Sequence, residues 1–268
     1  LRSIPKLFGK AAATAAVGGG ALYVTASTAH SSDALHPPEY PWSHNGVMSA
    51  YDAGSIRRGH QVYQQVCAAC HGLKRIAYRN LVGVCYTEEE AKMMASEKEY
   101  LDGPDDTGEM FDRPGKLSDY MQSPYKNENE ARYANNGGLP PDLSLITKAR
   151  HGGADYLFAL LTGYRDPPAG VVIAEGQWWN PYYPGGKIQM PQPLYDGHIE
   201  YEDGTPATAS QLAKDVTTFL AWAGEPEQDE RKKMGVKAIF ALTICAIGAG
   251  YYKRLLWSPF KSRKISFH

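Results

Sequence analysis

Apolar side chains recur at helical spacing near the end of the polar part of the chain. Between residues 209 and 222, Leu212, Val216, Phe219 and Leu220 stand at positions i, i+4, i+7 and i+8. These positions share one face of an α-helix. The spacing therefore predicts an amphipathic helix over residues 209–222.

Two further helices are indicated by residues suited to helix N-termini. Ser55 is predicted to cap a helix over residues 56–66. The apolar stripe of that helix comprises Ile56, Tyr63 and Val66, with Val62 at its edge. Thr87 and Glu90 have the spacing of a capping box, which predicts a helix over residues 88–100.

The rest of the segment between His36 and Glu230 is rich in loop-forming residues. Proline and glycine cluster at residues 137–141, 166–170 and 180–193. There is no internal repeat and too little apolar–polar alternation for a sizeable sheet. The predicted fold is mainly α, with long loops.

Residues 234–252 form a 19-residue stretch whose only charge is Lys237. As a helix it would be about 28 Å long, close to the hydrocarbon thickness of a bilayer, and Lys237 could reach the interface. We expect a transmembrane helix; a buried core helix is the alternative. Trp257 suits an interfacial anchor, and the basic tail beyond predicts a C-terminus on the matrix or cytoplasmic side.

The N-terminal segment combines a basic arm with a weakly apolar run. Arg2, Lys6 and Lys10 precede residues 11–29, which carry no charge. This pattern is typical of a sorting signal that is normally removed, and we expect here a retained membrane segment with its basic arm on the matrix side. The predicted division is residues 1–33 as sorting or membrane segment, 34–230 as the main domain, 231–256 as the transmembrane helix and 257–268 as the tail.

Charge is unevenly distributed in a chain whose net charge is only −1. Residues 85–130 hold 13 acidic and 5 basic side chains. Such a run is usually a solvated surface, but it can also attract a basic partner by long-range electrostatics. A nucleic-acid partner is not expected.

Cys67, Cys70 and His71 form the sequence C-x-x-C-H, the attachment signature of a c-type haem. Two thiols one turn apart can each form a thioether with a porphyrin vinyl group, and the following imidazole can bind the iron. The alternatives are a redox cysteine pair, which normally accompanies a βαβ pattern, or a zinc site, which needs a second pair of ligands. Neither accompaniment is found, so we predict one covalently bound haem c.

The two remaining cysteines do not indicate a disulfide. Cys85 lies in a polar region and Cys245 in the apolar stretch, so a bond between them is not expected. Covalent haem attachment takes place on the oxidising side of an energy-transducing membrane. The main domain is therefore predicted to face the intermembrane space or the periplasm.

Met190 is the preferred candidate for a second axial ligand. It lies in a loop of prolines and glycines that could hold a side chain without regular structure. A thioether ligand raises the reduction potential, which suits a late electron carrier. The rivals are the histidines His151 and His198, and more weakly the methionines Met93, Met94, Met110 and Met121.

Several longer runs carry a family resemblance beyond the C-x-x-C-H motif. They are SIRRG at 55–59, CAACH at 67–71, RPGKLSD at 113–119, LPPDLS at 139–144, LLTGY at 160–164, NPY at 180–182, DGTPAT at 203–208 and WS at 257–258. In this order they resemble the cytochrome c1 family, the haem subunits of mitochondrial ubiquinol–cytochrome c oxidoreductase. The resemblance covers about residues 35–264.

The resemblance implies a set of site residues. Cys67 and Cys70 would hold the haem, and His71 and Met190 would be its axial ligands. The implied pocket contains Asn135, Pro140, Pro141, Arg150, Tyr156, Leu160 and Leu161. Arg150 is expected to bind a haem propionate, since a guanidinium offers two donors to a carboxylate.

The resemblance further implies one-electron transfer without bond-making chemistry in this chain. Electrons would pass from a Rieske iron–sulfur protein to soluble cytochrome c, beside cytochrome b, other subunits and membrane lipid. The location implied is the mitochondrial inner membrane, with the haem domain in the intermembrane space and the C-terminus in the matrix. The alternative is a membrane-anchored haem enzyme such as a peroxidase, with an open sixth position on the iron.

Overall fold

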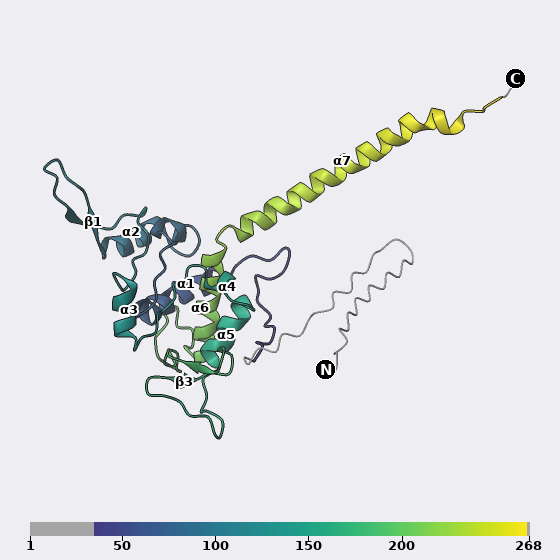
Figure 1. Cartoon of the computed structure of the whole chain (residues 1–268). Coiled ribbons are helices and arrows are strands. Elements are labelled where there is room, and N and C mark those ends of the chain that lie inside the picture. The colour runs from purple at the N-terminus through teal and green to yellow at the C-terminus, as the bar shows by residue number, and fades with distance from the viewer. Residues whose placement is uncertain (1–34, 267–268) are drawn as a thin grey trace, which may run out of the picture. The chain divides into compact units, whose positions relative to one another are not determined.

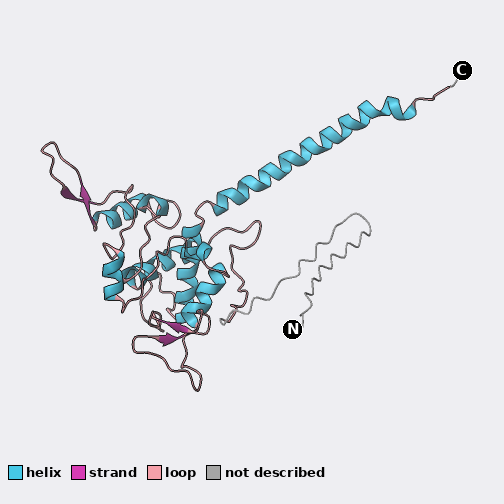
Figure 2. Ribbon diagram, in the orientation of Figure 1, coloured by secondary structure: helices cyan, strands magenta, loops and turns pink. Residues whose placement is uncertain are grey.

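The structure is a computed structural model that describes residues 35–266. The segment predicted for residues 1–33 lies outside the described residues. Helices dominate, with two small two-stranded antiparallel sheets, β1–β2 and β3–β4 (Figures 1 and 2). The mainly α prediction is confirmed.

The elements follow one another along the chain with long connections. They are α1 (Ala53–Gln65), η1 (Cys67–Ala69), η2 (Tyr78–Leu81), α2 (Glu88–Ser96), β1 (Glu99–Asp102), β2 (Phe111–Pro114), α3 (Glu128–Ala134), α4 (Ile146–Ala149), α5 (Gly153–Thr162), β3 (Trp178–Trp179), β4 (Lys187–Ile188), α6 (Ala209–Gly224) and α7 (Gln228–Ser262). The η elements are single 3₁₀ turns.

Helix α1 begins earlier than predicted. Asp52, not Ser55, is its N-cap: the Asp52 carboxylate accepts hydrogen bonds from the Gly54 N–H (3.1 Å) and from the Ser55 hydroxyl (2.8 Å). The prediction of Ser55 as cap was therefore wrong. An aspartate three residues before the serine takes the capping role and leaves the serine side chain buried inside the first turn.

Helix α2 has the predicted capping box but ends earlier than expected. The Thr87 hydroxyl accepts from the Glu90 N–H (3.2 Å), and the Glu90 carboxylate accepts from the Thr87 N–H (2.7 Å). The helix stops at Ser96 because the following residues form β1, which pairs with β2. The predicted extension to residue 100 was wrong, since pairing with a distant strand is not visible in local sequence.

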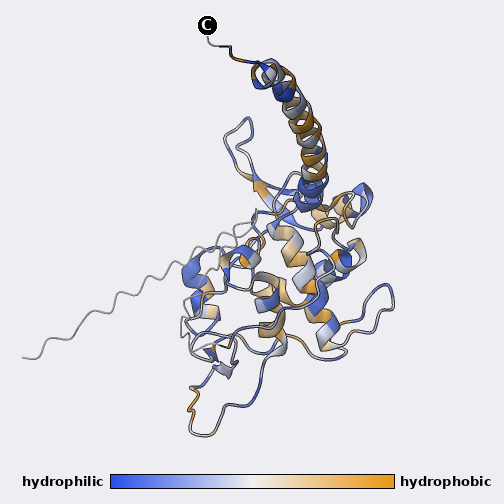
Figure 3. Ribbon diagram, turned by 90° about the vertical axis from the view of Figure 1, so that its right-hand side faces the viewer, coloured by the Kyte–Doolittle hydropathy of each residue, from blue (hydrophilic) through white to orange (hydrophobic). Residues whose placement is uncertain are grey.

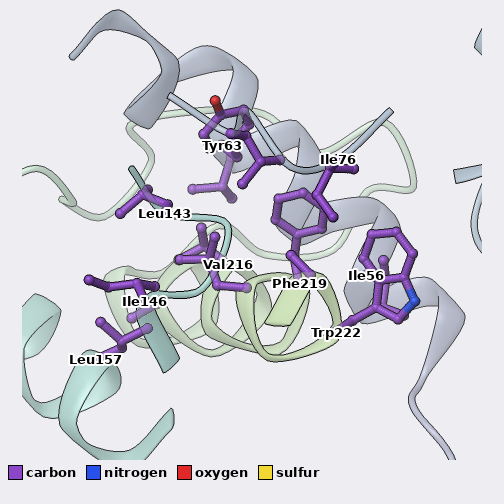
Figure 4. Close-up of a cluster of buried hydrophobic side chains, with 14 of the residues drawn as sticks. Ile56, Tyr63, Ile76, Leu143, Ile146, Leu157, Val216, Phe219 and Trp222 are labelled. Carbon is purple, nitrogen blue, oxygen red and sulfur yellow. The ribbon is translucent and has the colours of Figure 1, made fainter. Parts of the chain in front are cut away.

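The core is centred on the packing of α1 against α6, and α5 packs on the other side of α6. Figure 4 shows Tyr63 and Ile56 of α1 beside Val216, Phe219 and Trp222 of α6. The prediction of an amphipathic helix over residues 209–222 is confirmed, with Thr208 as N-cap. These side chains are almost fully buried, which provides the main hydrophobic stabilisation of the domain.

Gly59 allows α1 and α6 to approach closely. A Cβ built at Gly59 would lie 2.1 Å from the Asp215 carbonyl oxygen and 2.6 Å from the Phe219 Cβ. No real side chain fits at these distances, so this crossing requires glycine.

An ion pair joins the same two helices. Asp215 of α6 is fully buried, and its carboxylate accepts from Arg58 Nε (2.8 Å) and from Gln211 Nε2 (2.8 Å). A second carboxylate, that of Asp203, pairs with the same guanidinium at 2.8 Å. Removing Arg58 would leave a buried, uncompensated charge, which is strongly destabilising.

Helix α7 contains the apolar stretch predicted to span a membrane, and it extends beyond that stretch at both ends. Among the described residues it is the one helix long and apolar enough to cross a bilayer, and none of its apolar window is buried. Figure 3 shows hydrophobic turns along its middle. Its first turns are tied to residues 44–51: Tyr51 donates from its hydroxyl to Gln228 Oε1 (2.9 Å), and Lys232 Nζ donates to the Ser49 carbonyl (2.9 Å).

Replacing Gly59 tests the helix crossing. Gly59→Ala should lower the free energy of unfolding by about 1–3 kcal/mol or prevent folding, because the added methyl group meets backbone rather than a movable side chain. Gly54→Ala in the same helix is the control, since its Cβ meets nothing closer than 3.5 Å. Thermal unfolding of the full-length chain in detergent measures both. Equal stability of the two variants would contradict the close crossing.

Candidate functional site

The C-x-x-C-H motif lies directly after α1, in the 3₁₀ turn η1. The Cys67 carbonyl accepts from the Cys70 N–H (3.1 Å) and from the His71 N–H (2.9 Å). All three motif side chains therefore start from a single turn. Burial raises the pKa of the Cys67 thiol to about 12, unlike the low-pKa, activated thiol of a redox pair.

The imidazole of His71 is oriented by a backbone acceptor. His71 Nδ1 lies 2.8 Å from the Pro141 carbonyl oxygen. A carbonyl only accepts, so Nδ1 must carry the proton and Nε2 keeps its lone pair free. The Tyr63 hydroxyl donates to the His71 carbonyl (3.0 Å) and ties the residue to the core face of α1.

Met190 is held through its backbone beside the core. Its carbonyl accepts from the Tyr164 hydroxyl (3.0 Å), and its side chain is half-buried against the core cluster. Burial raises the pKa of Tyr164, so this phenol stays protonated and can donate. The preceding residue, Gln189, donates from Nε2 to the Asn136 carbonyl (3.3 Å), which brings the Met190 loop next to the turn after α3.

The other predicted pocket residues come from four segments. Tyr156 and Leu160 are buried on α5, and the neighbouring Leu161 is half-buried. Asn180 Nδ2 donates to the Leu160 carbonyl (2.7 Å), which links α5 to β3. Asn135 ends α3 and donates to the Tyr125 hydroxyl (3.0 Å).

Burial raises the pKa of Tyr156, and the nearby guanidinium of Arg150 partly offsets this rise. Arg150 donates to the carbonyl of its neighbour Ala149 (3.1 Å) and is otherwise exposed. Its expected bond to a propionate stays a prediction. Pro140 and Pro141 lie in the loop between α3 and α4, and the neighbouring Leu143 N–H donates to the Gly72 carbonyl (2.9 Å), directly after His71.

The rival axial ligands lie in varied surroundings. His151 and His198 are exposed, and His198 Nδ1 is 3.0 Å from the Pro193 carbonyl oxygen. Met93 and Met110 are exposed, Met94 is half-buried near Gln64, and Met121 is buried in the core. None of these contacts links a rival to the turn of Cys67 and His71.

The residues of this region fit a c-type haem by the chemistry of their donors. Two cysteines and a histidine share one turn, and the histidine has a fixed tautomer with Nε2 free for a metal. The buried side chains of α5 belong to the hydrophobic core cluster, and the Met190 thioether and Cys67 pack against this same cluster. This is the environment that such a cofactor needs.

Two tyrosines that position the candidate ligands were not recognised as such from the sequence. Tyr63 is the core tyrosine of α1, and Tyr164 ends the LLTGY run. Both were noticed only as apolar or motif positions. Their hydroxyl partners are backbone carbonyls 8 and 26 residues away, and a carbonyl is present at every residue, so it leaves no signal in the sequence.

Most of the chain matches proteins of one known family. A sequence model described as "Cytochrome C1 family" matches residues 42–260. The chain is 63% identical over 240 residues to "Cytochrome c1 1, heme protein, mitochondrial" of Arabidopsis thaliana, covering 90% of this chain and 78% of that protein. It is 61% identical over 234 residues to "Cytochrome b-c1 complex catalytic subunit, mitochondrial" of Candida albicans, covering 87% and 81%. To "Cytochrome c1, heme protein, mitochondrial" of Saccharomyces cerevisiae it is 56% identical over 252 residues, covering 92% and 82%.

Proposed function

Because the chain belongs to the cytochrome c1 family, we propose that it is the haem-bearing, electron-carrying subunit of a mitochondrial cytochrome b–c1 complex. The observation that carries the proposal is the turn of Cys67, Cys70 and His71, in which the Pro141 carbonyl fixes the imidazole tautomer. Family membership favours this carrier over the alternative of a membrane-anchored peroxidase.

Each ligand residue has a defined role in the proposal. Cys67 and Cys70 would form the two thioether bonds, His71 would bind through Nε2, and Met190 would supply a thioether sulfur. When bound, the haem supplies a one-electron Fe(III)/Fe(II) couple. The chain itself fixes the ligands, excludes water with the α5 side chains and offers Arg150 to a propionate.

The proposed electron path runs from a Rieske iron–sulfur protein to soluble cytochrome c, beside cytochrome b and other subunits. A Lys-rich cytochrome c would be attracted by the acidic stretch of residues 88–119. Four of its eleven carboxylates form ion pairs. Lys92 pairs with Glu88, Arg57 pairs with Glu90 and lowers its pKa to about 2, and Arg113 pairs with both Asp102 and Asp119.

The unpaired charge is concentrated on one projecting element, the acidic arm of residues 99–114. This β1–β2 hairpin extends away from the helices (Figure 2). Within the described part of the chain, five of its exposed carboxylates form no ion pair: Glu99, Asp105, Asp106, Glu109 and Asp112. The acidic arm is therefore the part of the stretch that can exert a long-range field on a basic partner.

Helix α7 supplies the proposed membrane anchor. None of its apolar window is buried by the described part of the protein, and such an exposed apolar surface is unfavourable in water but stable in lipid. Lys253, Arg254 and Lys261 follow the apolar stretch, and the positive-inside bias favours the matrix for this end. The haem domain then faces the intermembrane space of the inner membrane.

Covalent attachment is tested by removing both motif cysteines. Cys67→Ala combined with Cys70→Ala should abolish covalently bound haem, because no thioether can form. The measurement is haem-stained denaturing electrophoresis, with Cys85→Ala, a half-buried cysteine outside the motif, as control. Pigment that stays with the double variant would refute the attachment.

The second axial ligand is tested by Met190→Lys. Both thioether bonds to the haem survive, while an amine replaces sulfur and should lower the reduction potential. Redox titration of the haem absorption measures the change, and Met110→Lys on the acidic arm serves as control because it is exposed. Wild-type spectrum and potential in Met190→Lys would exclude Met190. A high-spin, peroxide-binding spectrum in the unaltered protein would instead favour the peroxidase.

Docking is tested on the acidic arm. Combined Asp106→Asn, Glu109→Gln and Asp112→Asn should lower the association rate with a Lys-rich cytochrome c by roughly tenfold at low salt and flatten its salt dependence. The control combines Glu39→Gln, Asp166→Asn and Glu175→Gln, which are exposed carboxylates outside the arm. Stopped-flow kinetics at several ionic strengths gives the rates. If both triple variants match the wild type, the arm has no role in docking.

A further inference from the structure

We propose that Asp142 is a positioning residue for the imidazole of His71, acting through the Pro141 carbonyl. This inference rests on the proposed function, in which His71 Nε2 binds the haem iron. In this view the Asp142 carboxylate holds in place the Pro141 carbonyl, which accepts the hydrogen bond that orients the His71 ring.

The Pro141 carbonyl, which accepts from His71 Nδ1, lies in a loop with few backbone hydrogen bonds of its own. Pro140 and Pro141 have no N–H group, so neither can anchor the loop by donating a backbone hydrogen bond. Both precede Asp142 in a connection without helix or strand. After the prolines, the Leu143 N–H donates to the Gly72 carbonyl (2.9 Å), and the Asp142 side chain adds further bonds to the same segment.

Asp142 joins that loop to the segment after His71. Its Oδ2 accepts from the Lys74 N–H (2.9 Å), and its Oδ1 accepts from the Ser144 N–H (3.0 Å). Beside it, the Ser144 hydroxyl accepts from the Arg75 N–H (3.1 Å). One carboxylate thus bridges the chain just beyond His71 and the chain just beyond Pro141.

The packing at Gly72 keeps the two segments close. A Cβ at Gly72 would lie 3.1 Å from Asp142 Oδ2 and 3.2 Å from Ser123 Oγ. The absence of a side chain at this position lets the carboxylate approach the residue that follows His71. The bridge therefore spans a short distance, and a small movement of Asp142 would be transmitted to the Pro141 carbonyl.

The bond from Nδ1 to a carbonyl controls how strongly an imidazole donates electrons. A carbonyl acceptor raises the basicity of a ligating histidine and fixes its ring orientation. A more basic ligand favours the higher charge of Fe(III). If the Pro141 carbonyl is no longer held in place, His71 becomes a weaker donor, and the reduced state gains relative to the oxidised state.

The test is the midpoint potential of the haem in the purified whole complex. Asp142→Ala should raise the potential, equivalent to a roughly tenfold higher ratio of reduced to oxidised haem at fixed electrode potential. Asp142→Asn also removes the charge but keeps the shape and one acceptor oxygen, so its shift should be smaller. Equal shifts in the two variants would assign the effect to charge and overturn the positioning role. Asp105→Ala is the matched control, because Asp105 also accepts loop N–H groups (Thr107 at 2.8 Å, Glu109 at 3.0 Å) but does so on the acidic arm.

The outcomes separate this inference from the proposed function. A wild-type potential in Asp142→Ala with haem still attached overturns the positioning role, even if thermal stability falls. If Asp142→Ala does not assemble, a wild-type potential in Asp142→Asn overturns it. The proposed function fails on the unaltered protein instead, if its haem is not covalently bound or not low-spin.

Discussion

The close crossing of α1 and α6 is the constraint on which the rest of the structure depends. Gly59 lets the two helices meet at backbone distance, and the buried Asp215 charge is compensated by Arg58 across the same contact. Because Cys67 follows α1 by two residues, this crossing also fixes where the C-x-x-C-H turn begins. The packing of α1 against α6 therefore sets the position of the C-x-x-C-H turn, and the loops complete the candidate site around it.

The elements predicted correctly are those with local signals. The apolar face of α6 and the capping box of α2 depend on residues within a few positions of one another, and both were found. The N-cap of α1 and the end of α2 were wrong, because Asp52 competes with Ser55 and because β2 pairs with the residues expected to continue the helix. In both cases two local structures compete, and the spacing of apolar residues does not show which of them is more stable.

The candidate site shows the same division. Its cysteines and histidine were proposed from spacing alone, and Met190 from its Pro/Gly-rich loop together with the family resemblance. The contacts that orient these residues could not be predicted, since Pro141 is 70 positions from His71 and Tyr164 is 26 positions from Met190. The local charge count likewise overstated the free acidity of residues 88–119, because Arg57 and Arg113 reach into it from the fold.

If Met190 binds the haem iron as proposed, the anchoring of its loop has a consequence for the speed of electron transfer. The Tyr164 hydroxyl holds the Met190 carbonyl, Gln189 is tied to Asn136, and Pro191 follows directly. A loop so restrained changes little when a neighbouring centre gains or loses a charge, so the reorganisation energy contributed by the protein stays small. Low reorganisation energy allows fast transfer with little driving force, which suits a one-electron carrier.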